Sequence, residues 1–303
     1  MSIATYFRRV FLLVSLTCAL SAHTAAAVAQ TAQRARVAVL DLGRTEEGRR
    51  TAESLGGSLA SDERLAIIDR DQSRAAALGA GYAGSLNMTL EEARSLGAVI
   101  DCDFFLTGDA QTLRRSPSVG PIYYEAYVAI FIVSARTGRL IMWERPSFEA
   151  QTPAEAEKRL FAELSSAALR GRYAMAISRA QEDERQARAL AQSHSTPVIE
   201  EAPTDTEAAA NGLRLPQPYR RLHPPYPAEA ARIEAEATVD VEVEIGADGE
   251  VSRVDVVRWA GFGLDDATVE TVRKLHFRPA MRDRAPVPMR VLLRYNFRKP
   301  PKQ

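Results

Sequence analysis

Short apolar runs alternate with segments of helical periodicity through the first half of the chain. The short apolar runs Arg36–Gly43, Arg64–Arg70 and Asp103–Ala110 are typical of buried strands. Helices are predicted between them at Glu46–Leu59 and Thr89–Gly97, and the second of these has a cap residue, acidic residues in its first turn and a glycine at its end. This alternation predicts a sheet with helices packed on it.

Two more strands and a helix follow. Tyr123–Ala150 contains two strand patterns joined at Arg136–Arg139, which predicts a hairpin. Thr152–Leu169 opens with a cap residue, a proline and a glutamate before apolar residues at helical spacing. The whole order predicts a mixed sheet with packed helices, of the α/β or α+β class, in a first domain over residues 34–170.

The pattern of large apolar residues then weakens. Arg172–Gln192 is rich in good helix formers with mixed charges, which predicts a solvated helical extension. Ser195–Pro218 combines proline, threonine, alanine and acidic residues without periodicity, which is typical of a linker. We therefore expect residues 171–215 to be a helical extension and disordered linker that leads to a second domain over residues 216–303.

The second domain begins with a predicted hairpin. Asp248 and Gly249 favour a tight turn, because both residue types tolerate the positive φ that it requires. With these two residues at the turn centre, one face of the hairpin is apolar, and the other carries Glu244 opposite Arg253. The apolar pairs are Val243 with Val254 and Val241 with Val256. Glu242 then faces Asp255, a like-charge pair that neighbouring arginines would relieve.

A helix and a last strand complete this domain. Asp265 and Asp266 lie at the start of the predicted helix, where they would cap free N–H groups. Its apolar face is formed by Leu264, Thr268, Val272 and Leu275. The last run, 287–298, alternates apolar and polar residues as a strand does. The order predicts a small ββαβ unit with a three-stranded antiparallel sheet and a helical lead-in at Tyr226–Ile233.

Charge and the N-terminal segment narrow the setting. The formal net charge is zero, so the basic excess that nucleic-acid binding requires is missing. Arg8 and Arg9, the apolar run Val10–Ala22 and small residues before Gln30 predict a signal peptide over residues 1–29. We therefore expect a periplasmic protein, exported by this signal and membrane-anchored if the signal is not cleaved.

Residues suited to catalysis or metal binding are few. Cys18 lies in the predicted signal, so Cys102 has no partner for a disulfide or a cysteine metal cluster. After the signal, the histidines His194, His223 and His276 are scattered, and no nucleophile, base and orienting group can be assembled. We expect no catalytic residue, no cofactor, no metal and no small-molecule substrate.

Two glycine-rich segments approach the spacing of phosphate-binding loops. In Gly43–Arg50 the glycines follow a strand, but Arg49 and Arg50 stand where a P-loop needs lysine and then serine or threonine. Gly79–Gly84 fits the pattern GxGxxG but follows a predicted helix, so its N–H groups would not meet a pyrophosphate at a helix start. We interpret both segments as loops without a nucleotide.

The second domain resembles the TonB C-terminal domain family. The resemblance rests on the lead-in His223–Ala230, the hairpin, the helix, the segment Phe277–Ala280 and the last strand, in that order over about 216–298. The sequence departs from the family pattern at Ala235–Ala237, where a glycine is usual, and at Trp259–Gly261, where Ser-Ser-Gly is common.

This resemblance implies a protein partner bound by strand addition. In TonB-like proteins the last strand or its neighbourhood receives a short segment of an outer-membrane transporter, in energy-coupled transmembrane transport. An edge strand offers unpaired N–H and C=O groups, so its backbone would bind the partner. The candidate partner-binding residues are Arg290, Val291, Leu292, Leu293, Arg294, Tyr295, Asn296 and Phe297.

The first domain resembles the curli-secretion and penicillin-binding-protein-activator group of envelope proteins. The matching residues are Asp69–Arg70, Leu96–Ala98, Gly108, Arg136–Gly138 and Trp143. This resemblance implies a non-catalytic domain that binds proteins in the cell envelope. An alternative function is therefore an envelope scaffold or cell-wall synthase regulator that acts through the first domain. An enzyme that uses the glycine-rich loops is a third hypothesis, and it requires nucleotide binding.

Overall fold

The computed structural model describes residues 34–193 and 199–299. The predicted signal peptide, residues 1–29, and His194 lie outside the described residues. Within these ranges, no helix combines the length and the apolar character needed to cross a membrane. The residues from Ala35 onward group into one compact unit.

The first sheet is mixed, as the sequence predicts. Its six strands are β1 (Ala35–Leu42), β2 (Leu65–Ile67), β3 (Phe104–Arg115), β4 (Tyr123–Ser134), β5 (Leu140–Glu144) and β6 (Ser147–Ala150). Their order is β2-β1-β3-β4-β5, and β6 also pairs with β4. The first three strands are parallel to one another and the later ones are antiparallel, because β3, β4 and β5 follow one another through hairpins.

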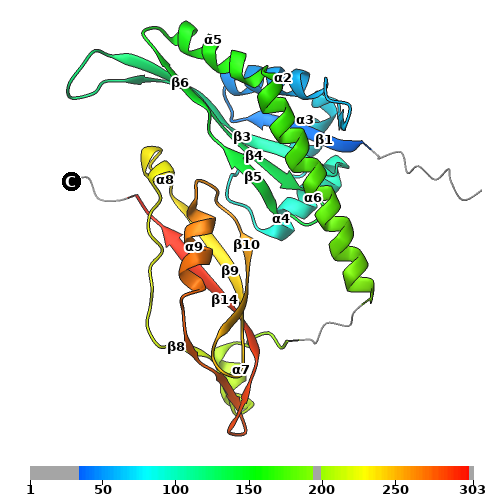
Figure 1. Cartoon of the computed structure of the whole chain (residues 1–303), viewed down its shortest axis with the longest axis vertical. Helices are drawn as coiled ribbons and strands as arrows, with labels where there is room; N and C mark the ends of the chain where they lie inside the picture. Colours follow the sequence, from blue (N-terminus) through cyan, green and yellow to red (C-terminus); the bar gives the residue numbers. More distant parts are fainter. Residues whose placement is uncertain (1–33, 194–198, 300–303) are drawn as a thin grey trace, which may run out of the picture. The chain divides into compact units, whose positions relative to one another are not determined.

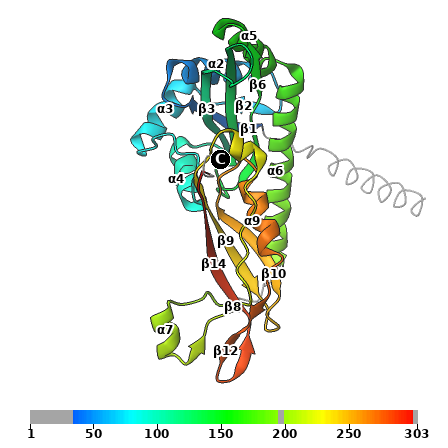
Figure 2. The same ribbon diagram turned by 90° about the vertical axis from the view of Figure 1, so that its left-hand side faces the viewer.

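Helices cover both faces of this sheet (Figures 1 and 2). The helices α2 (Glu46–Leu59), α5 (Pro153–Leu164) and α6 (Ala167–Ser193) pack on one face, whereas α3 (Arg70–Gly79) and α4 (Leu90–Ile100) pack on the other. Alternate residues of β1 therefore enter different cores. Val37 and Val39 join the first of these cores, and Ala38 and Leu40 join the second.

Local capping signals explain where these helices begin. The Thr45 hydroxyl accepts a hydrogen bond from the Gly48 N–H at the start of α2. Thr89 and Glu92 form a reciprocal capping box at α4, and Asp101 ends that helix in the left-handed conformation. The predicted helix starts are confirmed because they depend on neighbouring residues alone.

The helix α6 differs from the predicted solvated extension. It is continuous over 27 residues, and its first half is part of the core. Tyr173 and Ile177 are fully buried beside Leu169. The many alanines and charges of this stretch concealed the apolar stripe, which becomes visible only against the sheet. The prediction of a solvated helix fits the second half, where most residues are exposed.

Residues 199–218 also differ from the expected irregular linker. They contain α7 (Asp205–Ala210), β7 (Leu213–Arg214) and β8 (Gln217–Pro218). Thr204 and Glu207 form a capping box at α7. The short strands are ordered by distant partners, since β7 pairs with β12 (Ala280–Arg282) and β8 with β11 (Phe277–Arg278). β12 also pairs with β13 (Ala285–Val287). Such pairing has no local sequence signal.

The second sheet has the predicted three antiparallel strands, in the order β10-β9-β14. Its elements are α8 (Ala228–Arg232), β9 (Ala237–Ile245), β10 (Val251–Arg258), α9 (Leu264–Val272) and β14 (Met289–Phe297). The predicted register is confirmed, with Val243 opposite Val254, Val241 opposite Val256, and Glu244 opposite Arg253. The connection is wider than a two-residue turn, because the Gly246 N–H donates to the Glu250 carbonyl and a bulge follows Val251.

The like-charge pair in this register is relieved by arginines. Asp255, opposite Glu242, forms ion pairs with Arg253 at 2.5 Å and with Arg139 at 2.7 Å. Arg139 comes from the β4–β5 hairpin of the first sheet. The second of these ion pairs therefore links the two sheets.

Trp259 anchors the second sheet on the first. Its side chain is only 2% exposed and stacks on Phe131 of β4 with ring centroids 5.8 Å apart. Its Nε1–H donates to the Gly138 carbonyl at 3.1 Å. The Asn87 amide adds hydrogen bonds to the Thr238 and Trp259 backbones. The residue at which the sequence departs from the TonB pattern is thus a buried contact with the first sheet.

We predict that Trp259→Ala lowers the free energy of unfolding by about 3–5 kcal/mol, the usual cost of truncating a buried aromatic side chain. Urea denaturation followed by circular dichroism measures the change. Val119→Ala is the control, because Val119 is 89% exposed and its truncation should change stability by less than about 0.5 kcal/mol. Equal effects of the two substitutions would contradict a structural role for Trp259.

Candidate protein-binding edge

β14 is an edge strand of the second sheet. All nine of its residues pair with β9 without a register shift. On its other side, the described residues pair with it only at Arg290, where Glu201 forms a parallel bridge. The Arg290 N–H donates to the Glu200 carbonyl at 2.9 Å, and the Ala202 N–H donates to the Arg290 carbonyl at 2.8 Å.

This contact shows which backbone groups of β14 face outward. Polar groups of successive residues in a strand point to opposite sides, so the residues two, four and six positions after Arg290 face the same way. These are Leu292, Arg294 and Asn296. None of them has a further backbone partner on that side among residues 34–193 and 199–299. Three of the nine residues of β14 therefore form an unpaired edge from Leu292 to Asn296.

The predicted partner-binding residues fall into three groups. The first is Arg290, whose outward groups are already bonded to residues 200–202. The second comprises Leu292, Arg294 and Asn296, whose outward groups have no backbone partner in the described chain. The third comprises Val291, Leu293, Tyr295 and Phe297, which face β9 and pack against the core. That these residues bind a partner stays a prediction, and among them only the second group has outward backbone groups without a partner in the described chain.

Ion pairs hold β14 rigidly against β9. Arg294 donates two hydrogen bonds to the carboxylate of Asp240, at 2.7 and 2.9 Å, and Arg258 adds a third from β10. Burial acts to raise the pKa of Asp240, but the bonds from Arg294 and Arg258 outweigh it, so the pKa is lowered. Asp240 therefore stays ionised and joins all three strands. A fixed strand is a better template for strand addition than a mobile one.

Sequence reasoning missed the segment that covers Arg290. Besides the backbone bonds, Glu200 forms an ion pair with Arg282 at 2.7 Å. Glu201 lies 4.0 Å from the Arg290 guanidinium. The only available signal was opposite charge, acidic at 200–201 and basic along β14.

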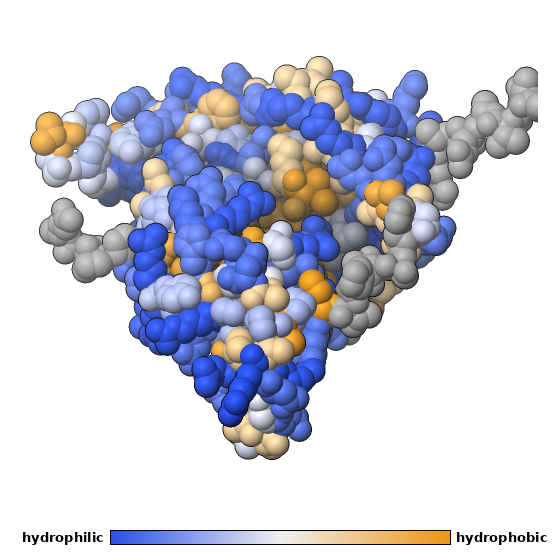
Figure 3. All heavy atoms as spheres, turned by 60° about the horizontal axis from the view of Figure 1, so that its bottom comes forward, coloured by the Kyte–Doolittle hydropathy of each residue, from blue (hydrophilic) through white to orange (hydrophobic). Residues whose placement is uncertain are grey.

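Across the side that Figure 3 shows, hydrophilic residues cover most of the surface and hydrophobic ones form small groups.

We predict alternating amide hydrogen exchange along β14. The amides of Val291, Leu293 and Tyr295 face β9 and should be protected, whereas those of Leu292, Arg294 and Asn296 should exchange at least roughly tenfold faster, since an unbonded amide needs almost no opening free energy. Arg290 is the internal control, because it is outward-facing but bonded to Glu200 and should be protected. Two-dimensional NMR measures these rates. Uniform protection would show that another segment covers the edge.

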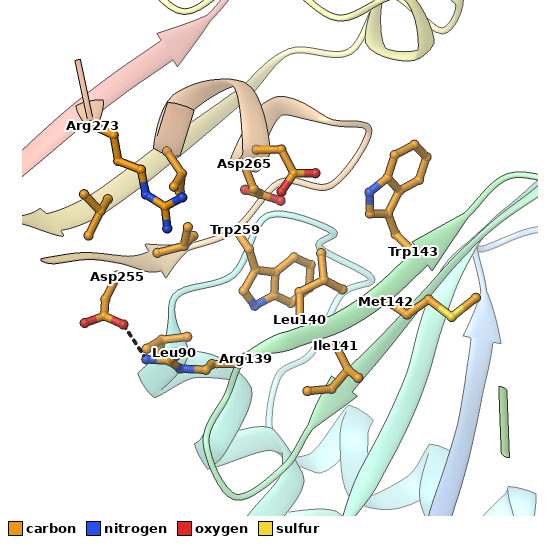
Figure 4. Close-up of a pocket in the computed structure, with 14 residues that line it drawn as sticks. Leu90, Arg139, Leu140, Ile141, Met142, Trp143, Asp255, Trp259, Asp265 and Arg273 are labelled. Carbon is orange, nitrogen blue, oxygen red and sulfur yellow. Dashed lines mark hydrogen bonds and ion pairs between the residues drawn. The ribbon is translucent and has the colours of Figure 1, made fainter. Parts of the chain in front are cut away.

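A pocket of about 550 Å³ lies between two other edge strands, β5 and β10, and is shown in Figure 4. Leu140 and Trp143 line it from β5, and Val254 and Val256 line it from β10. The ion pair between Arg139 and Asp255 crosses it. Its lining contains no serine, cysteine, histidine or lysine side chain.

Asp265 lines this pocket and corrects a prediction. It was expected to cap the helix that follows, but no side chain caps α9, and Gly263 occupies the N-cap position in the left-handed conformation. The Asp265 carboxylate instead accepts the N–H groups of Ala260 and Gly261, at 2.9 and 2.7 Å. It holds the loop that follows Trp259. Burial raises the pKa of Asp265 to about 6.

We predict that Asp265 makes stability depend on pH. The folded chain holds this proton between the ordinary pKa of 3.8 and about 6, whereas the unfolded chain has lost it. The free energy of unfolding of the wild type therefore falls as pH rises through this range, by up to about 3 kcal/mol relative to Asp265→Asn, which cannot titrate there. Urea denaturation of both proteins from pH 4 to pH 7 isolates this group because all others are shared. A constant difference would contradict the prediction.

The remaining residues that could carry chemistry, Cys102 and His276, lie in unreactive or exposed surroundings. Burial raises the pKa of the Cys102 thiol to about 12, which makes it a poor nucleophile. His276 contacts the Glu250 carboxylate at 2.9 Å in an exposed pair beyond the end of α9. Within the described residues, no group of three or more histidine, cysteine, aspartate or glutamate side chains could hold a metal ion.

Comparison with known proteins identifies the region that carries this edge. Residues 222–298 match the family model of the Gram-negative bacterial TonB protein C-terminal. The resemblance to TonB inferred from the sequence is confirmed for this region. The TonB match covers β9, β10, α9 and β14, so the unpaired edge from Leu292 to Asn296 lies within it. The match to TonB supports protein binding in the cell envelope as the role of this region.

Three of the solved structures with some likeness to the chain show how distant this likeness is. The hypothetical protein CT253 from Chlamydia trachomatis is 16% identical, with 46% of this chain and 96% of that chain covered and a TM-score of 0.34. The TonB C-terminal domain of Pseudomonas aeruginosa is 21% identical, with 29% and 90% covered and a TM-score of 0.26. The LpoB C-terminal domain of Salmonella enterica is 14% identical, with 39% and 83% covered and a TM-score of 0.28. None of the curated proteins matches the chain.

Proposed function

We propose that this chain is a non-catalytic periplasmic protein that binds an outer-membrane or other envelope protein by strand addition to β14. The observation that carries the proposal is the unpaired backbone of Leu292, Arg294 and Asn296 in a region that matches TonB. Three outward residues offer three N–H donors and three C=O acceptors. An extended partner segment of about five or six residues would span them at about 3.4 Å per residue.

The chain's own residues support this mode of binding. Residues 200–202 already add to β14 in the parallel direction, through two backbone hydrogen bonds at Arg290. The edge therefore accepts an extended segment in its present conformation. A partner strand that entered from Asn296 would meet the end of this internal segment at Arg290, which limits the length of strand that the edge receives.

The basic side chains of β14 face acidic partners within the chain, Arg294 at Asp240 and Arg290 at Glu244. Arg290, Arg294 and Arg298 are its basic residues, and the strand and the residue after it contain no acidic side chain. The internal segment fits this pattern, since Glu200 and Glu201 contact Arg282 and Arg290.

A role in transport depends on which protein binds β14. A partner in the outer membrane would make the chain part of energy-coupled transport, as the TonB resemblance implies. The alternative, a scaffold or cell-wall synthase regulator acting through the first sheet, predicts a different partner and no role for β14. Identifying the protein bound at β14 separates the two.

We predict that Leu292→Pro abolishes partner binding and leaves the fold intact. The Leu292 N–H is not used within the fold, and proline is tolerated on edge strands. Photo-crosslinking in intact cells, with p-benzoylphenylalanine in place of the exposed Asn296, measures partner capture. The crosslinked product should fall by about fivefold to a hundredfold, because a lost hydrogen bond and the proline ring together cost about 1–3 kcal/mol.

Leu292→Ala is the matched control. It removes the same exposed side chain and keeps the N–H donor, so the crosslinked product should persist. Circular dichroism confirms that both variants are folded. Mass spectrometry of the crosslinked product identifies the partner, and an outer-membrane protein supports the transport role. An unchanged product with Leu292→Pro would refute strand addition, and capture of a wall synthase would favour the alternative.

A further inference from the structure

The two glycine-rich segments, which separately predicted only loops, line the same pocket. This pocket has a volume of about 450 Å³. Gly43 and Arg44 line it from the end of β1, and Gly81 and Gly84 line it from the loop after α3. The Arg44 guanidinium joins the two segments by donating to the Ala83 carbonyl at 3.2 and 3.3 Å.

The pocket lies at the position where α/β sheets most often bind ligands. β1 is flanked by β2 and β3, both parallel to it. The connection from β1 to β2 runs through α2 on one face, and the connection from β2 to β3 runs through α3 and α4 on the other. The chain therefore reverses its winding at β1, and the crevice beyond the carboxyl end of such a strand is the usual binding position.

The charge of the lining selects an anion. Its charged side chains are those of Arg44, Arg49, Arg74 and Asp41. Arg49 is paired with Glu46 outside the lining, so Arg44 carries the charge that no acid neutralises. Asp41 is occupied by Arg70 at 2.8 Å and by Arg74 at 3.4 Å. Within the described residues, the Arg44 guanidinium donates only to the neutral Ala83 carbonyl, so no acid compensates its charge there. Guanidinium groups bind phosphate and carboxylate oxygens through paired donors.

The other wall of the pocket is apolar. Leu40 and Ala77 are buried beneath it, and Leu78 lies at its rim with 62% of its surface exposed. An exposed leucine beside a basic cluster suits a ligand with an apolar body and a charged head. The lining contains no serine, cysteine or histidine, so it provides for binding and not for nucleophilic chemistry.

A P-loop mode of binding is not available here. The Thr45 hydroxyl already accepts the Gly48 N–H at the start of α2, and Glu46 and Glu47 place negative charge in its first turn. An anion at that helix end would be repelled, so the arginine side chains must hold the head group. We infer that this pocket binds a small amphipathic anion, such as a phosphate monoester with a short apolar chain, through Arg44 and Arg74 at the head and Leu78 at the body.

Isothermal titration of the full chain with hexyl phosphate tests this inference. We expect saturable binding at one site, with hexanol and inorganic phosphate bound at least roughly tenfold more weakly, because each lacks one half of the recognition. Arg44→Gln should weaken binding about tenfold or more, the effect of losing a charge-assisted hydrogen bond. Arg94→Gln is the matched control, since Arg94 is an exposed arginine on α4 outside the pocket lining.

A second arm identifies the source of the phosphate group. Flotation with phosphatidylcholine vesicles that contain phosphatidate tests a lipid head group. If the chain binds the vesicles, and Arg44→Gln abolishes this binding while Arg94→Gln preserves it, the ligand is a lipid head group. If the chain binds hexyl phosphate but not the vesicles, the ligand is a soluble ester. The inference is overturned if hexyl phosphate shows no saturable binding up to about 1 mM, or if both substitutions have the same effect. The strand-addition proposal does not depend on either result.

Discussion

A strand at the edge of a sheet leaves every second residue without backbone partners, and this constraint determines what β14 can do. Its inward residues are committed to β9, and its outward residues can bond only to another segment. The chain supplies such a segment, residues 200–202, at Arg290, and the backbone pairing does not continue beyond this residue. The remaining outward residues, Leu292, Arg294 and Asn296, therefore keep the capacity to pair. Asp240 supports them indirectly, because its bonds to Arg294 and Arg258 hold the three strands together.

The attachment of the second sheet to the first explains an otherwise unusual sequence. Trp259 stands where the TonB pattern commonly has a small polar residue, and its ring is buried against Phe131. Asp265 holds the backbone on the far side of the same loop. A buried indole whose N–H is bonded to Gly138 resists rotation of this loop. The departure from the family pattern thus serves contact within this chain, while the edge strand stays on another side of the sheet.

The first sheet adds a separate binding surface. Reversal of the winding at β1 leaves a crevice at the end of that strand, and two glycine-containing loops meet there. In Gly43–Arg50, Arg49 and Arg50 replace the lysine and hydroxyl residues that a P-loop needs, and Gly79–Gly84 follows a helix where a dinucleotide motif follows a strand. One of these arginines, Arg49, lines the pocket together with Arg44 and Arg74, whereas Arg50 does not. Arg49 therefore excludes a P-loop nucleotide site, and in the folded chain it adds to a basic pocket that suits a different anion.

The sequence by itself determined the local elements and much of the second sheet. Caps at Thr45 and Thr89 place helix starts, and the valine alternation sets the register of β9 and β10, because both depend on residues close together in the chain. The TonB resemblance indicated β14 as the binding strand. Only the tertiary structure decided that residues 200–202 cover Arg290, that Trp259 is buried on Phe131, and that the two glycine loops share a pocket. Each of these contacts joins segments far apart in the chain, where neither propensity nor periodicity has any information about which residues meet.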